Sequence, residues 1–294
     1  MKIINNYYKN NKKAIAVFLT IFFLTTFSWA KAEKVQLDLG NKLIGHADFT
    51  QGDEEGTAII LIHGFLQTNN FYTVRRLADA LIESGHTVLT PNLSLGISHR
   101  KKSMACEAIH THTIEEDAKE IELWVNWLQQ KTKKEIRLIA HSAGSLSALA
   151  YFDRIEKTPV QQTILISLYT FGPGPAAYET EQDYQKASQA IQNNDQQLHE
   201  FGLSFCKKYV SNAQNYLSYY NWSNKRVDQV LAKPVLKNIS TAVIIGSDDK
   251  KINWDWINHL KQQKIQYIEV EGANHFFDKQ HEFDLLDSIE SLLP

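Results

Sequence analysis

A serine at position 142 lies between two small residues at the point where an apolar run ends. The local sequence is Ala140-His141-Ser142-Ala143-Gly144, preceded by Ile136-Arg137-Leu138-Ile139 and followed by a stretch of helical character. A strand, a sharp turn and a helix in this order can hold a serine hydroxyl where it acts as a nucleophile, and the close approach of strand and helix requires small flanking residues. On this pentapeptide alone, the N-cap of an ordinary helix is the alternative.

An activated serine needs a base and an acid that orients the base, and candidates for both follow late strands. Asp248 and Asp249 come directly after the apolar run 241–245, and His275 comes after the run 265–270. An imidazole can take the serine proton, and a carboxylate can hold that imidazole in the required tautomer. Taken singly, an Asp-Asp turn is often a solvated loop and a lone histidine is often structural. The order Ser, Asp, His, with each residue after a strand, favours nucleophilic catalysis.

Acyl transfer also needs two N–H donors for the oxyanion that forms during the reaction. The residue after the candidate nucleophile, Ala143, supplies one backbone N–H. The apolar run Ile60-Leu61-Ile62 ends in His63-Gly64-Phe65, which places the backbone N–H of Phe65 after an earlier strand. Phe65 and Ala143 are therefore the predicted oxyanion donors.

The elements that must position these residues are short apolar runs that alternate with amphipathic stretches. Continuous apolar runs are typical of strands covered on both faces, as in a parallel sheet. They lie at 58–62, 86–90, 136–139, 163–166, 241–245 and 265–270, and edge strands are expected at 35–39 and 46–49. Helical spacing covers 71–82, which Gly85 ends, 114–128, which a capping box at Thr113-Ile114-Glu115-Glu116 opens, and 283–292. This alternation predicts a doubly wound α/β fold with a mostly parallel sheet.

One segment, from about 176 to 233, departs from the alternation. It follows the breaker Gly172-Pro173-Gly174-Pro175, is rich in Gln, Asn and Tyr, and has no strand-like run. We therefore expect a helical insertion, a lid over the C-terminal edge of the sheet, with a polar loop at 189–197. Its aromatic residues, such as Tyr216 and Trp222, are expected to wall the substrate pocket, or else simply to pack the lid onto the domain.

On these motifs, the chain resembles the α/β-hydrolase superfamily over residues 58–294, with Ala140 in place of the usual first glycine. The resemblance implies that Ser142 is the nucleophile and His275 the general base. It places the acid at the fourth position of the Gly-x-x-Asp turn, which is Asp249, although the adjacent Asp248 stays open. Phe65 and Ala143 match the oxyanion donors of such enzymes, which use no cofactor and no metal.

The predicted function is that of a serine hydrolase that cleaves carboxylic esters or thioesters. Its expected partner is a small-molecule ester with an apolar acyl group. A peptidase or amidase of the same fold is the first alternative. A non-catalytic binding protein that retains the fold is the second.

The N-terminus predicts export. Four lysines precede the apolar run 14–24, which is followed by Ala30-Lys31-Ala32, a small-x-small cleavage signature. We expect a signal peptide over 1–32 and a mature α/β-hydrolase domain over 33–294 in the periplasm or the medium, without a stable membrane span. An uncleaved anchor is the alternative, although the apolar run is short for one.

The remaining features limit the partners of the mature chain. Without residues 1–32 the chain has 26 basic and 33 acidic residues, a formal net charge of −7, which argues against nucleic acid as a partner.

In an oxidising compartment, Cys106 and Cys206 are expected to form a disulfide. The loop 99–112 carries histidines but no standard metal-ligand spacing, so a specificity loop is favoured over a metal site. Within it, Arg100-Lys101-Lys102 predicts a solvated turn, with contact to an anionic substrate as the alternative.

Overall fold

The computed structural model describes residues 32–173, 177–233, 236, 238–263 and 265–293. The predicted signal peptide, apart from Ala32, lies outside these residues. Among the helices that are described, none combines the length and apolarity needed to cross a membrane.

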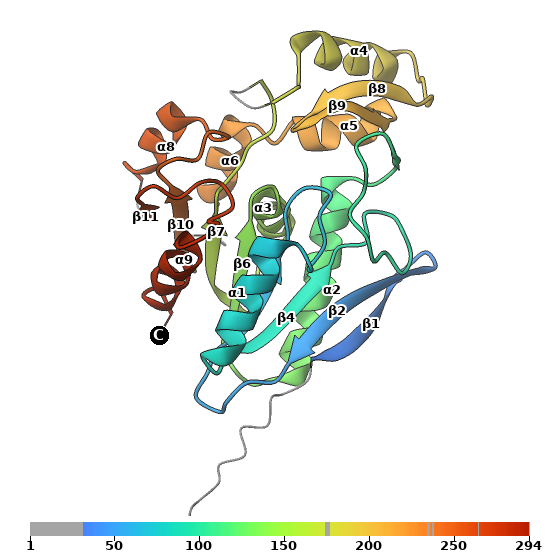
Figure 1. Cartoon of the computed structure of the whole chain (residues 1–294). Helices are drawn as coiled ribbons and strands as arrows, with labels where there is room; N and C mark the ends of the chain where they lie inside the picture. Colours follow the sequence, from blue (N-terminus) through green and yellow to red (C-terminus); the bar gives the residue numbers. More distant parts are fainter. Residues whose placement is uncertain (1–31, 174–176, 234–235, 237, 264, 294) are drawn as a thin grey trace, which may run out of the picture.

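An eight-stranded sheet forms the centre of the molecule (Figure 1), with the strand order β1-β2-β4-β3-β6-β7-β10-β11. The strands are β1 (Glu33–Gly40), β2 (Leu43–Thr50), β3 (Ala58–Ile62), β4 (Thr87–Asn92), β6 (Ile136–His141), β7 (Val160–Ile166), β10 (Ser240–Gly246) and β11 (Gln266–Val270). The pairs β1–β2 and β2–β4 are antiparallel, and all other neighbours are parallel. The predicted strands are therefore confirmed. Of the two expected edge strands, β1 lies at the edge of the sheet, whereas β2 pairs with strands on both sides.

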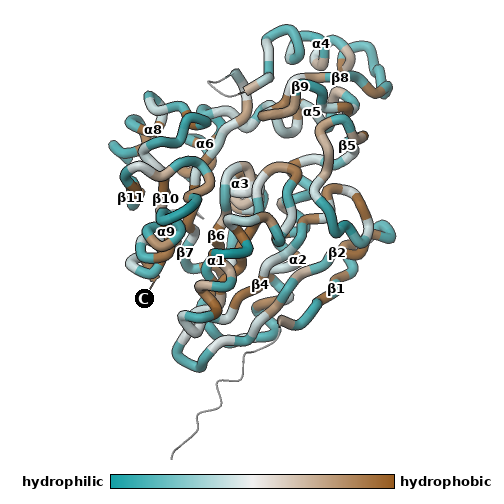
Figure 2. Tube along the Cα trace, viewed as in Figure 1, coloured by the Kyte–Doolittle hydropathy of each residue, from teal (hydrophilic) through white to brown (hydrophobic). Residues whose placement is uncertain are grey.

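Helices cover both faces of this sheet. One face packs against α1 (Tyr72–Glu83) and α9 (His281–Glu290). The other packs against α2 (Ile114–Lys131), α3 (Gly144–Arg154) and α8 (Trp254–Leu260). Burial on both faces explains why β3 is apolar and buried at all five positions. Figure 2 shows hydrophobic residues along the central strands and a mainly hydrophilic lid helix, α4.

Local signals at the helix ends also match the structure. The Thr113 side chain accepts a hydrogen bond from the backbone N–H of Glu116, and the Glu116 carboxylate accepts one from the backbone N–H of Thr113. This capping box fixes the start of α2. Gly85, just beyond α1, has φ +86°, a left-handed conformation that glycine adopts without strain.

The expectation that the insertion over 176–233, called the lid below, is purely helical was wrong. Between α4 (Glu181–Gln192) and α5 (Ala213–Tyr220), the chain forms a hairpin of β8 (His199–Leu203) and β9 (Cys206–Ser211), and α6 (Asn224–Leu231) follows. The strand β9 also pairs with β5 (Ile109–His110), so β9 is the central strand of a three-stranded sheet with the order β5-β9-β8. Because β5 comes from a loop far away in the sequence, no local pattern in the insertion indicates this pairing. The polar segment 189–197, expected to be a loop, is helical as far as Gln192.

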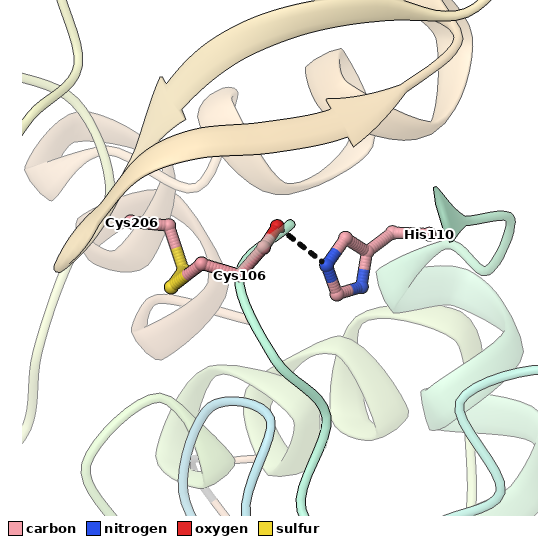
Figure 3. The surroundings of a disulfide bond; sticks show 3 residues. All are labelled: Cys106, His110 and Cys206. Atoms are coloured by element: carbon pink, nitrogen blue, oxygen red, sulfur yellow. Dashed lines mark hydrogen bonds between the residues drawn. A yellow bond between two sulfur atoms is a disulfide. The ribbon is translucent and has the colours of Figure 1, made fainter. Parts of the chain in front are cut away.

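The predicted disulfide between Cys106 and Cys206 is confirmed, with a Cα–Cα distance of 5.2 Å (Figure 3). It joins the loop between β4 and β5 to the start of β9, directly after the hairpin turn. Beside it, the His110 Nε2–H donates to the Cys106 carbonyl at 3.2 Å. The lid is therefore fixed covalently to the main domain at its hairpin.

Candidate active site

Ser142 occupies the turn between β6 and α3 and has φ +57°, a left-handed conformation that is rare for a residue with a side chain. Its backbone N–H donates to the carbonyl of Ile166 in β7 at 2.8 Å, which holds the turn against the sheet. At Gly144, an added Cβ would lie 2.2 Å from the carbonyl oxygen of His63, so only glycine fits there. The turn therefore depends on the close approach of α3 to the loop after β3, whereas the small residues predicted a close approach of the flanking strand and helix.

A chain of hydrogen bonds runs from Ser142 through His275 to Asp249. The Ser142 Oγ lies 2.8 Å from the His275 Nε2, and the His275 Nδ1–H donates to the Asp249 Oδ2 at 2.7 Å. Since a carboxylate only accepts, this tautomer leaves the Nε2 lone pair toward the serine hydroxyl. Asp249 is fully buried, whereas Asp248 is exposed and takes no part in the chain. The structure thus brings together the expected serine, histidine and second aspartate.

Both oxygens of the Asp249 carboxylate are occupied, because the backbone N–H of Lys251 donates to its Oδ1 at 2.9 Å. The loop that carries His275 is fixed as well: its carbonyl accepts from the His141 Nε2–H and from the Ser167 hydroxyl, each at 2.9 Å. Burial and the neighbouring His275 lower the pKa of His141 to about 3, so His141 is a neutral donor. The supporting roles of His141 and Ser167 have no signal in the sequence, since they depend on β6, β7 and the His275 loop meeting at one edge.

The two expected oxyanion donors belong to Ala143, which directly follows the serine, and to Phe65 in the loop after β3. Among the described residues, neither the Phe65 N–H nor the Ala143 N–H has a hydrogen-bond acceptor. An added Cβ at Gly64 would lie 3.2 Å from the Ser142 Cβ, so the loop after β3 passes close to the serine. Two unpaired N–H groups beside a hydroxyl can stabilise a developing negative charge on a bound carbonyl oxygen.

The side chain of Phe65 links this loop to the lid. Its ring centroid lies 5.5–6.0 Å from the rings of four aromatic residues, namely Phe171, Phe205, Tyr209 and Tyr219. Three of these belong to the lid, and Phe171 precedes it. The aromatic cluster therefore joins the lid to the loop that offers one of the free N–H groups.

A small pocket of about 30 Å³ opens at the serine hydroxyl. Its lining consists of Phe65, Gln67, Ser142, Tyr169, Ser204, Phe205, Lys251, His275 and Phe276. A larger hollow of about 250 Å³ adjoins it and shares Tyr169 and Lys251. Most of this lining was not predicted from the sequence. Phe276 directly follows His275, and Lys251 comes two residues after Asp249, so their places in the chain were the available signal.

The expectation that Tyr216 and Trp222 wall this pocket was wrong. Tyr216 is fully buried inside the lid, where its ring stacks on Phe201 at 4.1 Å between centroids. Trp222 is buried too, and neither residue lines the pocket. Both pack the lid, which was the alternative. The lid reaches the pocket instead through Ser204 and Phe205, which lie in the hairpin turn before Cys206.

Arg100, expected in a solvated turn, is buried behind the loop after β3, whereas Lys101 and Lys102 are exposed. Its guanidinium donates to the carbonyl of Leu93 at 2.7 Å and lies 3.2 Å from the His63 Nε2. Burial and the Arg100 charge lower the pKa of His63 to about 3, so His63 is neutral. Its Nδ1–H donates to the Gly64 carbonyl at 2.9 Å, which fixes the loop beside Ser142. Arg100 therefore supports the site from behind and lines neither hollow beside the serine.

The histidines of the loop 99–112 do not form one cluster: His110 and His112 lie together, with 6.1 Å between ring centroids, and His99 contacts a different histidine. His99 pairs with His46, with the two ring nitrogens 2.8 Å apart, whereas His110 stacks on Tyr209 at 4.1 Å and His112 is buried against Tyr219. Within the part of the chain that the structure describes, no three His, Cys, Asp or Glu side chains form a group that could hold a metal ion.

Comparison with known proteins agrees with this topology. A family model described as the alpha/beta hydrolase fold matches residues 57–201, and no curated protein sequence matches the chain. Est1E from Butyrivibrio proteoclasticus is similar in structure, with a TM-score of 0.60 and 15% identity over 90% of this chain and 97% of its own. A thermophilic esterase from Thermogutta terrifontis has a TM-score of 0.59 and 17% identity over 89% and 98%.

A serine hydrolase without a lid, from Xanthomonas campestris, has a TM-score of 0.53 and 15% identity over 90% of this chain and 96% of its own. At such identities, the likeness to these structures concerns the fold. The chain therefore has the α/β-hydrolase fold, as its motifs predicted.

The buried carboxyl of Asp117 leads to a prediction on stability. It accepts from the Tyr219 hydroxyl at 2.7 Å and the Ser147 hydroxyl at 3.3 Å, and burial raises its pKa to about 8. Between about pH 4 and pH 8 the folded chain keeps a proton that the unfolded chain releases, so this group lowers the free energy of unfolding as pH rises. Asp117→Asn removes this pH-dependent decrease in the free energy of unfolding, and the amide oxygen can still accept hydrogen bonds.

We expect Asp117→Asn to raise the free energy of unfolding by about 1–3 kcal/mol at pH 9 and by much less at pH 5. Urea denaturation of the variant and the native chain at pH 5, 7 and 9 measures this difference. Asp287→Asn, an exposed change on α9, is the control and should leave the pH dependence unaltered. If the Asp117→Asn and native curves ran parallel over this range, Asp117 would not hold its proton in the folded state.

Proposed function

We propose that this α/β hydrolase is a serine hydrolase that cleaves carboxylic esters or thioesters. The observation that carries the proposal is the hydrogen-bonded chain from Ser142 through His275 to the buried Asp249. A left-handed serine backbone and a buried carboxylate both cost folding free energy, and a protein that only binds a ligand needs neither. This cost favours catalysis over a binding role.

In the proposed reaction, the Ser142 Oγ attacks the ester carbonyl carbon while its proton passes to the His275 Nε2. The negative charge on the carbonyl oxygen is stabilised by the N–H groups of Phe65 and Ala143. The tetrahedral intermediate then breaks its bond to the leaving oxygen or sulfur, which takes the proton from His275. A water molecule, deprotonated by His275, attacks the acyl-enzyme. The bond from the acyl carbon to the Ser142 Oγ then breaks, the Oγ takes the proton back from His275, and the acid is released. Asp249 stabilises the imidazolium in both halves of the reaction.

The pocket supports a substrate with an apolar or aromatic part. The rings of Phe65, Phe205 and Phe276 line the space beside the serine hydroxyl. Such walls favour apolar groups over sugars. Esterases among the similar structures make ester cleavage our choice over amide or peptide cleavage by the same residues.

We also propose that the chain is exported and loses residues 1–32. The Cys106–Cys206 disulfide supports this proposal, because disulfides persist in oxidising compartments such as the periplasm. The net charge of −7 that remains argues against nucleic acid as a partner.

Substitutions in the proposed triad test the mechanism. Ser142→Ala removes the nucleophile and should lower kcat for ester hydrolysis at least about a thousandfold. Asp249→Asn leaves His275 without its anionic partner and should lower kcat about 10²–10⁴-fold. Asp248→Asn is the matched control, because Asp248 is exposed, and should change kcat by less than about twofold. Circular dichroism checks that each variant is folded; unchanged turnover by Ser142→Ala would refute the assignment.

Substitutions in the lid test which residues select the substrate. Phe205→Ala removes a pocket wall and should change the relative kcat/KM values across an ester series of graded acyl length by about tenfold. Tyr216→Ala removes a ring buried inside the lid, so it should lower stability by about 3–5 kcal/mol and leave the relative rates unchanged. If Phe205→Ala left the order of substrates intact, selection would have to lie outside the hairpin turn.

Sequencing the N-terminus of the protein recovered from the cell envelope or medium tests export. We expect the chain to begin at Glu33, because cleavage should follow the Ala30-Lys31-Ala32 signature. The same material should carry two fewer hydrogens before reduction than after it. A chain that begins at Met1 and leaves the membrane only in detergent would show an uncleaved anchor instead.

A further inference from the structure

The half-buried side chain of Lys251 faces the pocket beside Ser142. The residue follows Asp249 by two positions, and it lines both the small pocket at the serine and the larger hollow beyond. Its Nζ lies 4.5 Å from the ring centroid of Phe276 and 5.9 Å from that of Phe205. These contacts hold the ammonium group at the boundary between the two hollows.

Lys251 has no ion-pair partner within 4.0 Å among the described residues. The sequence outside those residues contains no aspartate or glutamate, so no side-chain carboxylate from there can serve. Burial lowers the pKa of Lys251, and the charge of Asp249 offsets only part of that effect. Both Asp249 oxygens already accept hydrogen bonds, from His275 and from the Lys251 backbone. The ammonium N–H donors therefore remain available to a ligand.

Among the described residues that line the two hollows, the lysines are not matched by any carboxylate. The two hollows are lined by Lys251 and Lys225 and by no aspartate or glutamate among the described residues. This contrasts with the net acidic charge of the mature chain. Carboxyl groups lie close by, but outside these two linings. Asp249 is hydrogen-bonded to His275 and to the Lys251 backbone, and Glu179 is buried near Tyr169. Asp248 and Asp255 belong to a separate, open hollow beyond Asn253. A small anion entering the space beside Ser142 therefore meets a cation that is partly removed from water, where a charge-assisted hydrogen bond is strong.

We propose that Lys251 binds a carboxylate on the substrate, so that the preferred substrates are esters with an anionic group beyond the scissile bond. The aromatic rings would hold the apolar part between the two ends, and Lys251 would hold the far end. The inference rests on the proposed ester hydrolysis at Ser142 and adds a substrate class to it. Lys251 is in this view a specificity-determining residue, distinct from the groups that move protons.

Pairs of esters of matched length, in which a carboxylate replaces a methyl group, test the proposal. In the acyl part, 4-nitrophenyl hemiadipate is compared with 4-nitrophenyl hexanoate; in the leaving group, 4-carboxyphenyl butanoate is compared with 4-methylphenyl butanoate. We expect the native chain to prefer the anionic member of one pair, and the pair that shows the preference places the carboxylate on the acyl or the alcohol side. No preference in either pair would overturn the proposal.

Variants of Lys251 connect the preference to this side chain. Lys251→Met keeps the backbone N–H that binds Asp249, and it should lower the ratio of anionic to neutral kcat/KM at least about tenfold, mainly through KM. Lys251→Arg should retain much of the preference, and Lys251→Glu should reverse it. Lys250→Met is the matched control, because Lys250 is exposed and lines neither hollow, and its ratio should equal the native one.

If the Lys251 variants lost kcat/KM equally on both members of a pair, Lys251 would instead be a residue that positions Asp249, and the proposal would be wrong.

A binding measurement separates this inference from the proposed function. Isothermal titration calorimetry should detect binding of the anionic ester to the Ser142→Ala variant. This binding should be lost in the double variant that also carries Lys251→Met. Covalent labelling of native Ser142 by a fluorophosphonate tests the nucleophile independently, so labelling without an anionic preference would reject only the role of Lys251.

Discussion

The left-handed backbone at Ser142 is the constraint on which the rest of the site depends. It is sustained because β6, β7 and α3 leave the turn no room to relax: its N–H is bound to Ile166, and Gly144 lies against the carbonyl of His63. The same close approach brings the loop after β3 beside the serine. One steric condition therefore presents the hydroxyl and places both free N–H groups next to it.

The lid adds side chains to the lining of the pocket beside the serine. Phe65 offers its backbone N–H toward the site and its ring toward Tyr209 and Tyr219 of the lid, so the donor loop and the lid hold each other in place. The disulfide at Cys206 fixes the hairpin whose turn presents Phe205 to the pocket. Below the lid, the buried carboxyl of Asp117 bonds the hydroxyl of Tyr219. Residues that line the pocket thus also take part in the contacts that hold the fold together.

Much of the main domain could be predicted from sequence because its elements obey local rules. Strands buried on both faces are continuously apolar, and the carboxyl ends of parallel strands meet at one edge. We therefore expected the serine, the aspartates and the histidine to converge, because each of them follows such a strand. The choice of Asp249 over Asp248 followed from the resemblance alone, and the structure adds the physical reason, which is that only the second side chain points into the protein.

Features that depend on contacts distant in sequence were missed. The hairpin of the lid pairs with β5, which belongs to another loop, so its strands carry no convincing pattern of their own. Arg100 looked like part of a solvated basic turn, because its burial against Leu93 and His63 exists only in the folded chain. Lys251 was overlooked for the same reason. Its significance comes from the rings and the absence of acidic neighbours in the two described hollows, and the sequence shows neither.

The central claim is that Ser142 is an activated nucleophile, and covalent labelling tests it most directly. The native chain is treated with a fluorophosphonate, digested, and mapped by mass spectrometry, with urea-unfolded chain treated in parallel. We predict a single adduct on the peptide that contains Ser142 in the folded chain and none in the unfolded chain, where His275 no longer accepts the proton. Labelling of a different serine, or no labelling of folded protein, would contradict the account.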